Sequence, residues 1–199
     1  QVSGLVSGVT AIGAGASFSC AIVSGAVKCW GIGALGELGN GSFSNSSIPV
    51  QVTGLTSGVT KLTVGSNHAC AVMNNSVYCW GKNSNGQVGD NSNTNRNTPV
   101  QINMLPVGQI QSLSAGNLHT CAVVNFTAYC WGANGSYQLG DNTNIDKLIP
   151  TSVMGINNVT SIATGASHSC AIYDDYINNK KNLVKCWGSN ASGELGNGS

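Results

Sequence analysis

The chain of 199 residues has little charge: eight Lys and Arg stand against seven Asp and Glu, so charged residues make up 8% and the net charge is +1. A typical soluble protein carries about 25% charged residues. Binding to nucleic acid or to an anionic membrane surface depends on a basic excess, which is missing here. Long hydrophobic runs are missing too, since no stretch reaches the roughly 18 apolar residues of a spanning helix. We therefore expect no nucleic-acid partner and no membrane insertion.

Neutral polar residues take the place of charge, with 24 Asn and 27 Gly in the chain. Hydrophobic residues make up 41%, which argues against disorder, because disordered chains are poor in apolar residues. The chain begins at Gln1 rather than Met and shows no signal peptide, so we expect a processed or excised segment.

The sequence repeats itself four times. Cys-Trp-Gly recurs with Trp spacings of 50, 51 and 56 residues, at Trp30, Trp80, Trp131 and Trp187. The upstream cysteine of each unit keeps spacings of 50, 51 and 49, so the last unit carries about seven extra residues between its two cysteines. We expect one repeat domain over residues 1–199, with approximate repeats 1–50, 51–100, 101–150 and 151–199.

The two termini are in phase with the repeat. Residues 1–5 (QVSGL) match residues 51–55 (QVTGL), and the chain stops at Asn-Gly-Ser where the first unit reads the same at residues 40–42. The end of the chain would thus lead almost directly into its own beginning. Three arrangements fit this phase: a piece of a longer propeller or array, head-to-tail association with copies of itself, or closure as a four-bladed propeller.

Each unit contains short β-type runs separated by Gly-rich turns. In the first unit these runs are residues 9–12, 20–23 and 26–29, with an edge segment at 48–50. Ser24-Gly25 is a two-residue hairpin signal between the second and third runs. No 3.6-residue periodicity is present, so the pattern predicts an all-β repeat of about four short antiparallel strands. A period near 50 residues fits a blade of a β-propeller.

Each unit carries two cysteines. With a hairpin turn at residues 24–25, Cys20 lies opposite Cys29 in a non-hydrogen-bonded pair, whose Cα atoms are about 4.5 Å apart. That distance suits a disulfide, whereas zinc sites favour more closely spaced cysteines. We predict four disulfides and an oxidising compartment. The pairs are Cys20 with Cys29, Cys70 with Cys79, Cys121 with Cys130, and Cys170 with Cys186.

Further marks recur in phase with the strands. Gly-x-x-His occurs at residues 65–68, 116–119 and 165–168, and each Trp-Gly is followed by a Gln/Glu-Leu/Val-Gly step. On these marks the chain resembles the regulator-of-chromosome-condensation repeat family over essentially its whole length. The resemblance implies a β-propeller, usually of seven blades. The cysteine-flanked units are similar to the secreted branch of that family rather than to the nuclear one.

Three histidines, His68, His119 and His168, share one repeat position, which Phe18 occupies in the first unit. In a closed propeller they could converge on the axis as metal ligands. Alternatively, each forms a hydrogen bond within its own blade. Because Phe18 breaks the set and no carboxylate accompanies it, we favour the hydrogen bond and expect no metal and no cofactor.

The Trp residues and the acids also have two readings. The four Trp could form a carbohydrate-stacking platform, but their recurrence beside a disulfide favours packing between blades.

Glu37 and Glu194 share one repeat position, and Asp90 and Asp141 share another. A glycosidase needs two convergent carboxylates, whereas repeat-equivalent acids lie in different blades. With no nucleophile, phosphate-loop or paired-His motif, we expect no catalytic residue and no enzyme.

The extra segment of the fourth unit is the most individual feature of the sequence. It could be a longer solvated hairpin or a contact loop for a partner or subunit. The candidate contact residues are Tyr173, Asp174, Asp175, Tyr176, Lys180 and Lys181. In the nuclear member of the resembled family an inserted wedge acts on a small GTPase, although the cysteines here argue against a nuclear partner.

Asn-x-Ser/Thr sequons occur eight times, a modest excess over composition, and are candidate glycosylation sites in a eukaryotic secretory pathway. They are Asn40, Asn45, Asn74, Asn125, Asn134, Asn158, Asn190 and Asn197.

The sequence as a whole favours a non-catalytic extracellular repeat protein. It would be a glycosylated subunit or segment of a larger surface assembly, adhesin or filament, with copies of itself, further repeats, a protein or a glycan as partners. Two alternatives stay open. One is a secreted module that recognises or inhibits a protein, for which a secreted β-lactamase inhibitor is the family precedent. The other is a guanine-nucleotide exchange factor of the nuclear type.

Overall fold

The structure is a computed structural model and describes residues 1–198. Within these residues the regular elements are fifteen short β-strands in four antiparallel sheets. No helix in this part of the chain is long and apolar enough to cross a membrane. The prediction of an all-β repeat is confirmed, with three sheets of four strands and a last sheet of three.

The strands of each sheet follow one another in chain order. The first sheet holds β1 (Val9–Ala14), β2 (Phe18–Val23), β3 (Ala26–Gly31) and β4 (Ser46–Gln51). The second holds β5 (Val59–Val64), β6 (His68–Met73), β7 (Ser76–Gly81) and β8 (Arg96–Gln101). The third holds β9 (Ile110–Ala115), β10 (His119–Val124), β11 (Thr127–Gly132) and β12 (Lys147–Ser152). The fourth holds β13 (Val159–Thr164), β14 (His168–Asp175) and β15 (Lys180–Gly188).

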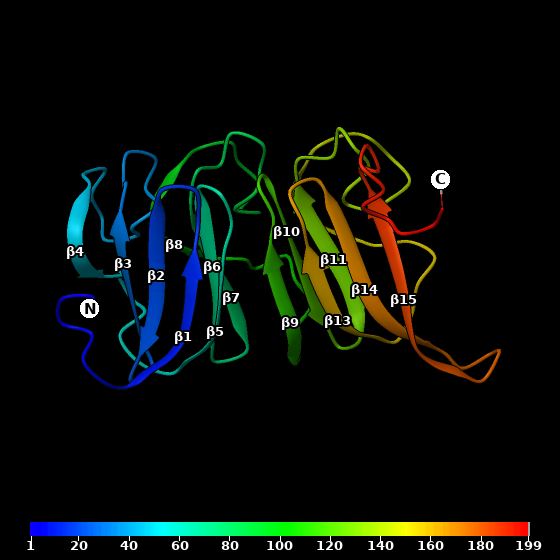
Figure 1. The fold of residues 1–199 in the computed structure, drawn as a ribbon, viewed down its shortest axis with the longest axis horizontal. Helices are drawn as coiled ribbons and strands as arrows, with labels where there is room; N and C mark the ends of the chain where they lie inside the picture. The colour runs from blue at the N-terminus through cyan, green and yellow to red at the C-terminus, as the bar shows by residue number, and fades with distance from the viewer. Residues whose placement is uncertain (199) are drawn as a thin grey trace.

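The four sheets, which we call blades 1 to 4, stand side by side in an open row (Figure 1). Their first strands contact one another in succession, β1 with β5, β5 with β9 and β9 with β13. Blade 1 forms one end of the row and blade 4 forms the other (Figure 1). The arrangement is that of consecutive propeller blades that do not close into a ring.

The central hairpin of each blade is set by its turn. Ser24 and Gly25 have φ values of 51° and 80°, and Asn74 and Asn75 have 52° and 56°. Two successive residues with positive φ make the type I′ turn, whose twist matches that of antiparallel strands. The resulting register pairs each first cysteine with the second cysteine of its blade.

All eight cysteines form disulfides across these hairpins, with Cα–Cα distances of 4.0 to 4.1 Å. The bonds join Cys20 to Cys29, Cys70 to Cys79, Cys121 to Cys130 and Cys170 to Cys186. Six of these cysteines, those of blades 1 to 3, are fully buried.

The hydrophobic core lies between blades. One cluster joins Phe18, Ile22 and Val27 of blade 1 to Val59 and Trp80 of blade 2. Two further clusters repeat this arrangement at the next two boundaries. Each blade therefore presents one apolar face to the blade before it and another to the blade after it, as in repeat proteins whose units are stable only when stacked.

Candidate interaction surfaces

A histidine of one blade hydrogen-bonds to a hydroxyl of the next at two boundaries. Nε2 of His68 lies 2.9 Å from Oγ1 of Thr120, and Nε2 of His119 lies 3.0 Å from Oγ of Ser169. The sequence predicts a bond inside one blade, which is wrong: the partner lies in the following blade. Each hydroxyl also contacts a backbone carbonyl of the blade that holds the histidine, Gln87 for Thr120 and Gln138 for Ser169. The hydroxyl is therefore bonded twice to the preceding blade.

The direction of these bonds follows from the hydroxyls. Thr120 donates its proton to the carbonyl of Gln87 at 2.9 Å, and Ser169 donates to the carbonyl of Gln138 at 2.8 Å. Each hydroxyl oxygen is therefore an acceptor toward histidine, so both imidazoles carry their proton on Nε2. Burial, together with the neighbouring histidine, lowers the pKa of His68 to about 3 and that of His119 to about 4. Both rings are neutral at physiological pH.

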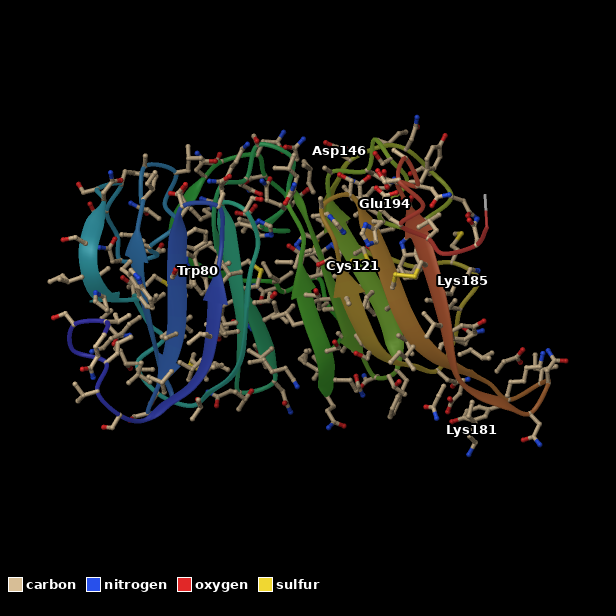
Figure 2. All side chains as sticks on the ribbon, in the orientation of Figure 1. Trp80, Cys121, Asp146, Lys181, Lys185 and Glu194 are labelled. Carbon is tan, nitrogen blue, oxygen red and sulfur yellow. A yellow bond between two sulfur atoms is a disulfide. The ribbon has the colours of Figure 1, made fainter. Side chains whose placement is uncertain are left out.

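Three of the four tryptophans donate to a backbone carbonyl of the preceding blade, and for Trp131 and Trp187 it is the carbonyl that the hydroxyl also contacts. The indole N–H of Trp80 donates to the carbonyl of Glu37 at 2.9 Å, and those of Trp131 and Trp187 donate to Gln87 and Gln138 at 3.0 Å. Trp80, which Figure 2 labels, and Trp131 are fully buried in the cores between blades. The structure thus places Trp80, Trp131 and Trp187 in the packing between blades, whereas Trp30 lines an open hollow at the free face of blade 1.

The loops after the first strands of all four blades line one shallow hollow of about 320 Å³. Most of its lining residues are small, and they include Gly15, Gly65, Gly116 and Gly165. The histidine rings lie behind these glycines, since a Cβ on Gly65 would be 2.4 Å from Cε1 of His68. Among the described residues, no group of three His, Cys, Asp or Glu side chains could hold a metal ion.

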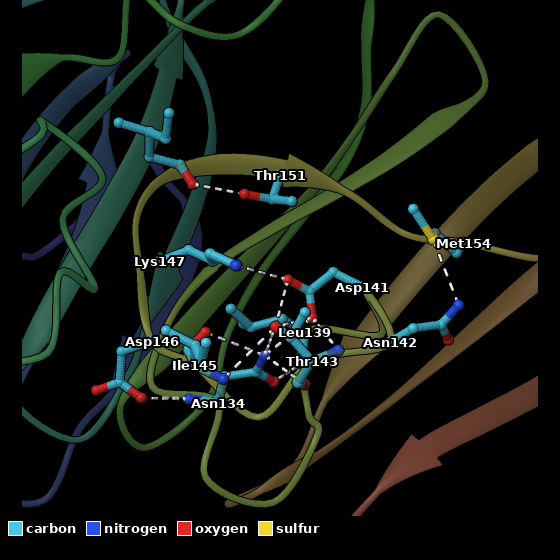
Figure 3. Close-up of polar contacts among 11 residues, drawn as sticks. Asn134, Leu139, Asp141, Asn142, Thr143, Ile145, Asp146, Lys147, Thr151 and Met154 are labelled. Atoms are coloured by element: carbon cyan, nitrogen blue, oxygen red, sulfur yellow. Dashed lines mark hydrogen bonds and ion pairs between the residues drawn. The ribbon is translucent and has the colours of Figure 1, made fainter.

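The repeated acids organise loops within their own blades. Asp141 accepts hydrogen bonds from Asn134 at 3.0 Å and from Thr143 at 2.8 Å, and Lys147 lies 3.2 Å from its carboxylate (Figure 3). Asp90 is bound in the same way by Asn83, Ser92 and Arg96. Burial raises the pKa of each carboxyl, but these hydrogen bonds outweigh it and leave both values below the usual range.

The acids that share the other repeat position also belong to loops. Glu37 is buried and accepts the N–H of Leu35 at 2.7 Å, and Glu194 is exposed and accepts the N–H of Ser192 at 2.8 Å. Glu37 lies in blade 1 and Glu194 follows the last strand of blade 4, so they do not form a carboxylate pair. Asp90 and Asp141 likewise bond to Asn83 and Asn134 in the loops of two different blades.

The extra segment of blade 4 is a hairpin extension over residues 174–182. The ladder between β14 and β15 runs past Tyr173 and Leu183 to the pair Asp175 and Lys180. The extension projects beyond the end of the row, where Figure 2 places Lys181. Tyr176 and Ile177 at its tip are 61% and 96% exposed. These residues, with Asp174, Asp175 and Tyr173, line a mostly polar hollow of about 270 Å³ against the loop at 155–158.

The sequons differ in exposure. Asn45, Asn74 and Asn125 are exposed, and Asn40, Asn158 and Asn190 are half-buried. Asn134 is fully buried, and its amide donates to Asp141, Thr143 and the carbonyl of Ile145. Asn197 is exposed, but its sequon includes Ser199, which lies outside the described residues.

The hydrogen bonds between blades are the feature that sequence reasoning missed. A signal for them was present: the residue before each first cysteine is Ser19, Ala69, Thr120 or Ser169. Where one blade carries a histidine, the next blade carries a hydroxyl residue at this position. Where blade 1 carries Phe18, blade 2 carries Ala69. Comparing the histidine position of one repeat with the position before the first cysteine of the next repeat identifies the pairing.

Comparison with solved structures shows the same fold in longer proteins. Human WBSCR16 matches with a TM-score of 0.85 and 22% identity, over 100% of this chain and 52% of that one. Prp20p from Saccharomyces cerevisiae matches with a TM-score of 0.82 and 21% identity, over 96% of this chain and 48% of that one. The receptor kinase CR4 ectodomain from Physcomitrella patens matches at 0.57 and 22%, over 92% and 42%. The chain thus spans about half the length of the first two.

A family model gives a more specific result than these structures. No curated protein sequence matches the chain significantly. The model of the regulator of chromosome condensation (RCC1) repeat, however, matches residues 24–72, 74–123 and 127–172, and a second model of the same repeat matches residues 59–87. These matches cover most of the chain, and its four disulfides agree with a disulfide-containing branch. The chain therefore belongs to the RCC1 repeat family.

Proposed function

We propose that this chain is a non-catalytic extracellular interaction protein that assembles head to tail. It would be a subunit or segment of a larger surface assembly, adhesin or filament. One observation carries the proposal: the two end blades expose the apolar surfaces that the inner blades bury. Val9 of blade 1 is 41% exposed, whereas its counterpart Val59 in blade 2 is 6% exposed. Soluble monomers rarely leave such matched faces open.

The disulfides support the extracellular part of the proposal. Four disulfides in 199 residues, with no free cysteine among those described, favour an oxidising compartment. Exposed sequons such as Asn45 and Asn74 would carry glycans there. Comparing the mass of the native protein after alkylation with and without prior reduction tests this. Eight alkylated thiols without reduction would exclude an extracellular protein.

The size of the protein in solution tests the assembly. We expect sedimentation velocity to show species larger than 20.2 kDa whose proportion rises with concentration, and electron microscopy to show rings or fibres. A monomer that persists at the highest attainable concentration would refute head-to-tail assembly of this chain.

The second candidate function is a secreted module that recognises or inhibits another protein. The hairpin extension favours it, because Tyr176 and Ile177 are exposed at the tip of a projecting element. Solved structures of the family include Prp20p, whose binding to Gsp1p and histones was studied, and yeast RCC1 bound to Kap60. A regulator of the exchange-factor type is less compatible with the disulfides. Loss of binding to a purified partner on deletion of residues 174–182, with self-assembly unchanged, would favour the binding module.

A further inference from the structure

Blade 1 presents an unfilled apolar hollow at the head of the row. It measures about 350 Å³ and is lined by Val2, Leu5, Val9, Ile12 and Trp30, among others. Ile12 is 78% exposed, whereas Ile162 at the same repeat position of blade 4 is 4% exposed because blade 3 covers it. The head therefore has the shape and chemistry of a surface that a preceding blade covers.

Blade 4 presents the complementary surface at the tail. Ile172 is 39% exposed and Val184 is 67% exposed. Their counterparts in blade 1, Ile22 and Val27, are 2% and 0% exposed because they pack against blade 2. The tail is therefore the surface that a following blade covers at the inner boundaries.

The polar residues at the two ends form a matched set. Strand pairing aligns Ser19 with Trp30, just as Thr120 pairs with Trp131 and Ser169 with Trp187. At the inner boundaries, the residue that pairs with the tryptophan depends on the aromatic ring of the preceding blade. It is a hydroxyl residue where that ring is a histidine, and it is Ala69 where the ring is Phe18. The tail carries a histidine, His168, and the head carries a hydroxyl, Ser19. The two free ends thus have the combination that the inner boundaries use.

The geometry points to a junction in which the tail of one copy packs on the head of a second copy. At this junction Nε2–H of His168 donates to Oγ of the partner's Ser19. The hydroxyl of the partner's Ser19 and the indole N–H of the partner's Trp30 both donate to the carbonyl of Glu194. This inference rests on the proposed head-to-tail assembly and names the residues that select its register.

Backbone hydrogen bonds at the inner boundaries add to the fit. Val52 N–H donates to the carbonyl of Val27 at 3.0 Å, and Thr53 N–H donates to the carbonyl of Gly39 at 2.9 Å. Residues 1–5 repeat the sequence of residues 51–55, so the partner's Val2 N–H reaches the carbonyl of Val184 in the same way. Gly196 has open space where its counterparts Gly89 and Gly140 meet a tryptophan, which leaves room for the partner's Trp30.

A pair of face-blocking variants tests the polarity of the junction in the full chain. Ile12→Arg blocks the head and Val184→Arg blocks the tail, and both positions are exposed, so each monomer should fold normally by circular dichroism. We expect each variant alone to be monomeric by sedimentation velocity and an equimolar mixture to form a one-to-one dimer and nothing larger. Val107→Ser, at a fully exposed site in the loop between β8 and β9, should assemble like the unaltered chain.

A second set of variants tests the His168–Ser19 pair itself. Ser19→Ala leaves a histidine N–H buried without an acceptor, so the association constant should fall by about tenfold. His168→Phe combined with Ser19→Ala reproduces the Phe18–Ala69 combination and should restore association to within about threefold of the unaltered chain.

The outcomes separate this inference from the proposed function. No association of the unaltered chain would refute both. Association that survives Val184→Arg, or a double variant as weak as Ser19→Ala, would overturn the junction while leaving some other self-assembly in place. If only a longer chain with further blades, or an unrelated protein, covers these ends, the 199-residue chain stays monomeric and the second copy is the wrong occupant.

Discussion

The Cα of Gly116 packs against the carbonyl oxygen of Gly165 in the next blade, so that a Cβ at residue 116 would lie 2.5 Å from that oxygen. It would also lie 2.5 Å from Cε1 of His119. The first neighbour is backbone of blade 4, and the second is a buried ring that hydrogen-bonds to Ser169, so an added methyl group would disturb contacts between the two blades. We expect Gly116→Ala to lower the free energy of unfolding by about 1–3 kcal/mol, as overpacking does. Urea denaturation measures this.

Gly135→Ala is the matched control for this substitution. Nothing lies within 4 Å of a Cβ at residue 135, and no positive φ is required there. Its effect should stay within about 0.5 kcal/mol. Equal losses for the two variants would show that close packing between blades is not the reason for glycine at residue 116.

Acid should weaken the protein through its buried histidines. The pKa of His68 in the folded protein is about 3 and that of His119 about 4, both below the 6.5 of an unperturbed histidine. Between these values the unfolded chain binds more protons than the folded one, so the free energy of unfolding falls as pH decreases below about 6.5. Each histidine should contribute a slope of up to about 1.4 kcal/mol per pH unit. Urea denaturation at pH 7, 6 and 5 measures the slope.

A variant built on the chain's own Phe18–Ala69 combination serves as control for the pH prediction. His68→Phe with Thr120→Ala removes one titrating ring and its acceptor together. The slope between pH 6 and 5 should fall by about half. Asp90 and Asp141 do not obscure this window, because their pKa values lie below the usual range. An unchanged slope would mean that other groups cause the acid sensitivity.

One disulfide should be reduced before the others. Cys170 and Cys186 are half-buried at the open end of the row, whereas the six other cysteines are fully buried. At protein concentrations too low for assembly, graded dithiothreitol should expose Cys170 and Cys186 to alkylation first, as peptide mass spectrometry would show. Simultaneous reduction of all four would mean that the blades open together.

Glycan attachment should follow exposure. When the chain is secreted from eukaryotic cells, we expect glycans at Asn74, on an exposed hairpin turn, and none at Asn134, which is buried with its amide bonded to Asp141. Glycopeptide mass spectrometry distinguishes the two. A fully occupied Asn134 would contradict this burial, because a glycan on Nδ2 would replace one of the hydrogens that the loop uses.

Much of the fold is readable from the sequence because each unit carries strong local signals. The positive φ of Ser24 and Gly25 makes a two-residue turn, and the turn alone fixes Cys20 opposite Cys29. The strands of blade 1 are two or three residues longer than the apolar runs predict. Phe18, for example, lies in β2 and is buried in the cluster that blade 1 forms with blade 2, a contact that local patterns do not contain.

The contacts between blades were harder to predict. The histidine bonds join residues about 50 positions apart, such as His68 and Thr120, and neither residue signals the other locally. The burial of Asn134 is a similar case. Its sequon looks like a surface turn, yet Asp141 and Thr143 draw the amide inward. The residue types of His68 and Asn134 are each compatible with several roles, and tertiary hydrogen bonds decide which role each one has.

One repeat position holds Phe18 in the first unit and a histidine in the other three, and this difference affects how the gene can change length. Loss of residues 101–150 by recombination between repeats would place His68 next to Ser169, a combination the protein already uses. Loss of residues 51–100 would place Phe18 next to Thr120 and leave that hydroxyl oxygen without its donor. Units that look interchangeable are therefore not equally dispensable. When the array shortens, loss of the third unit should be tolerated better than loss of the second.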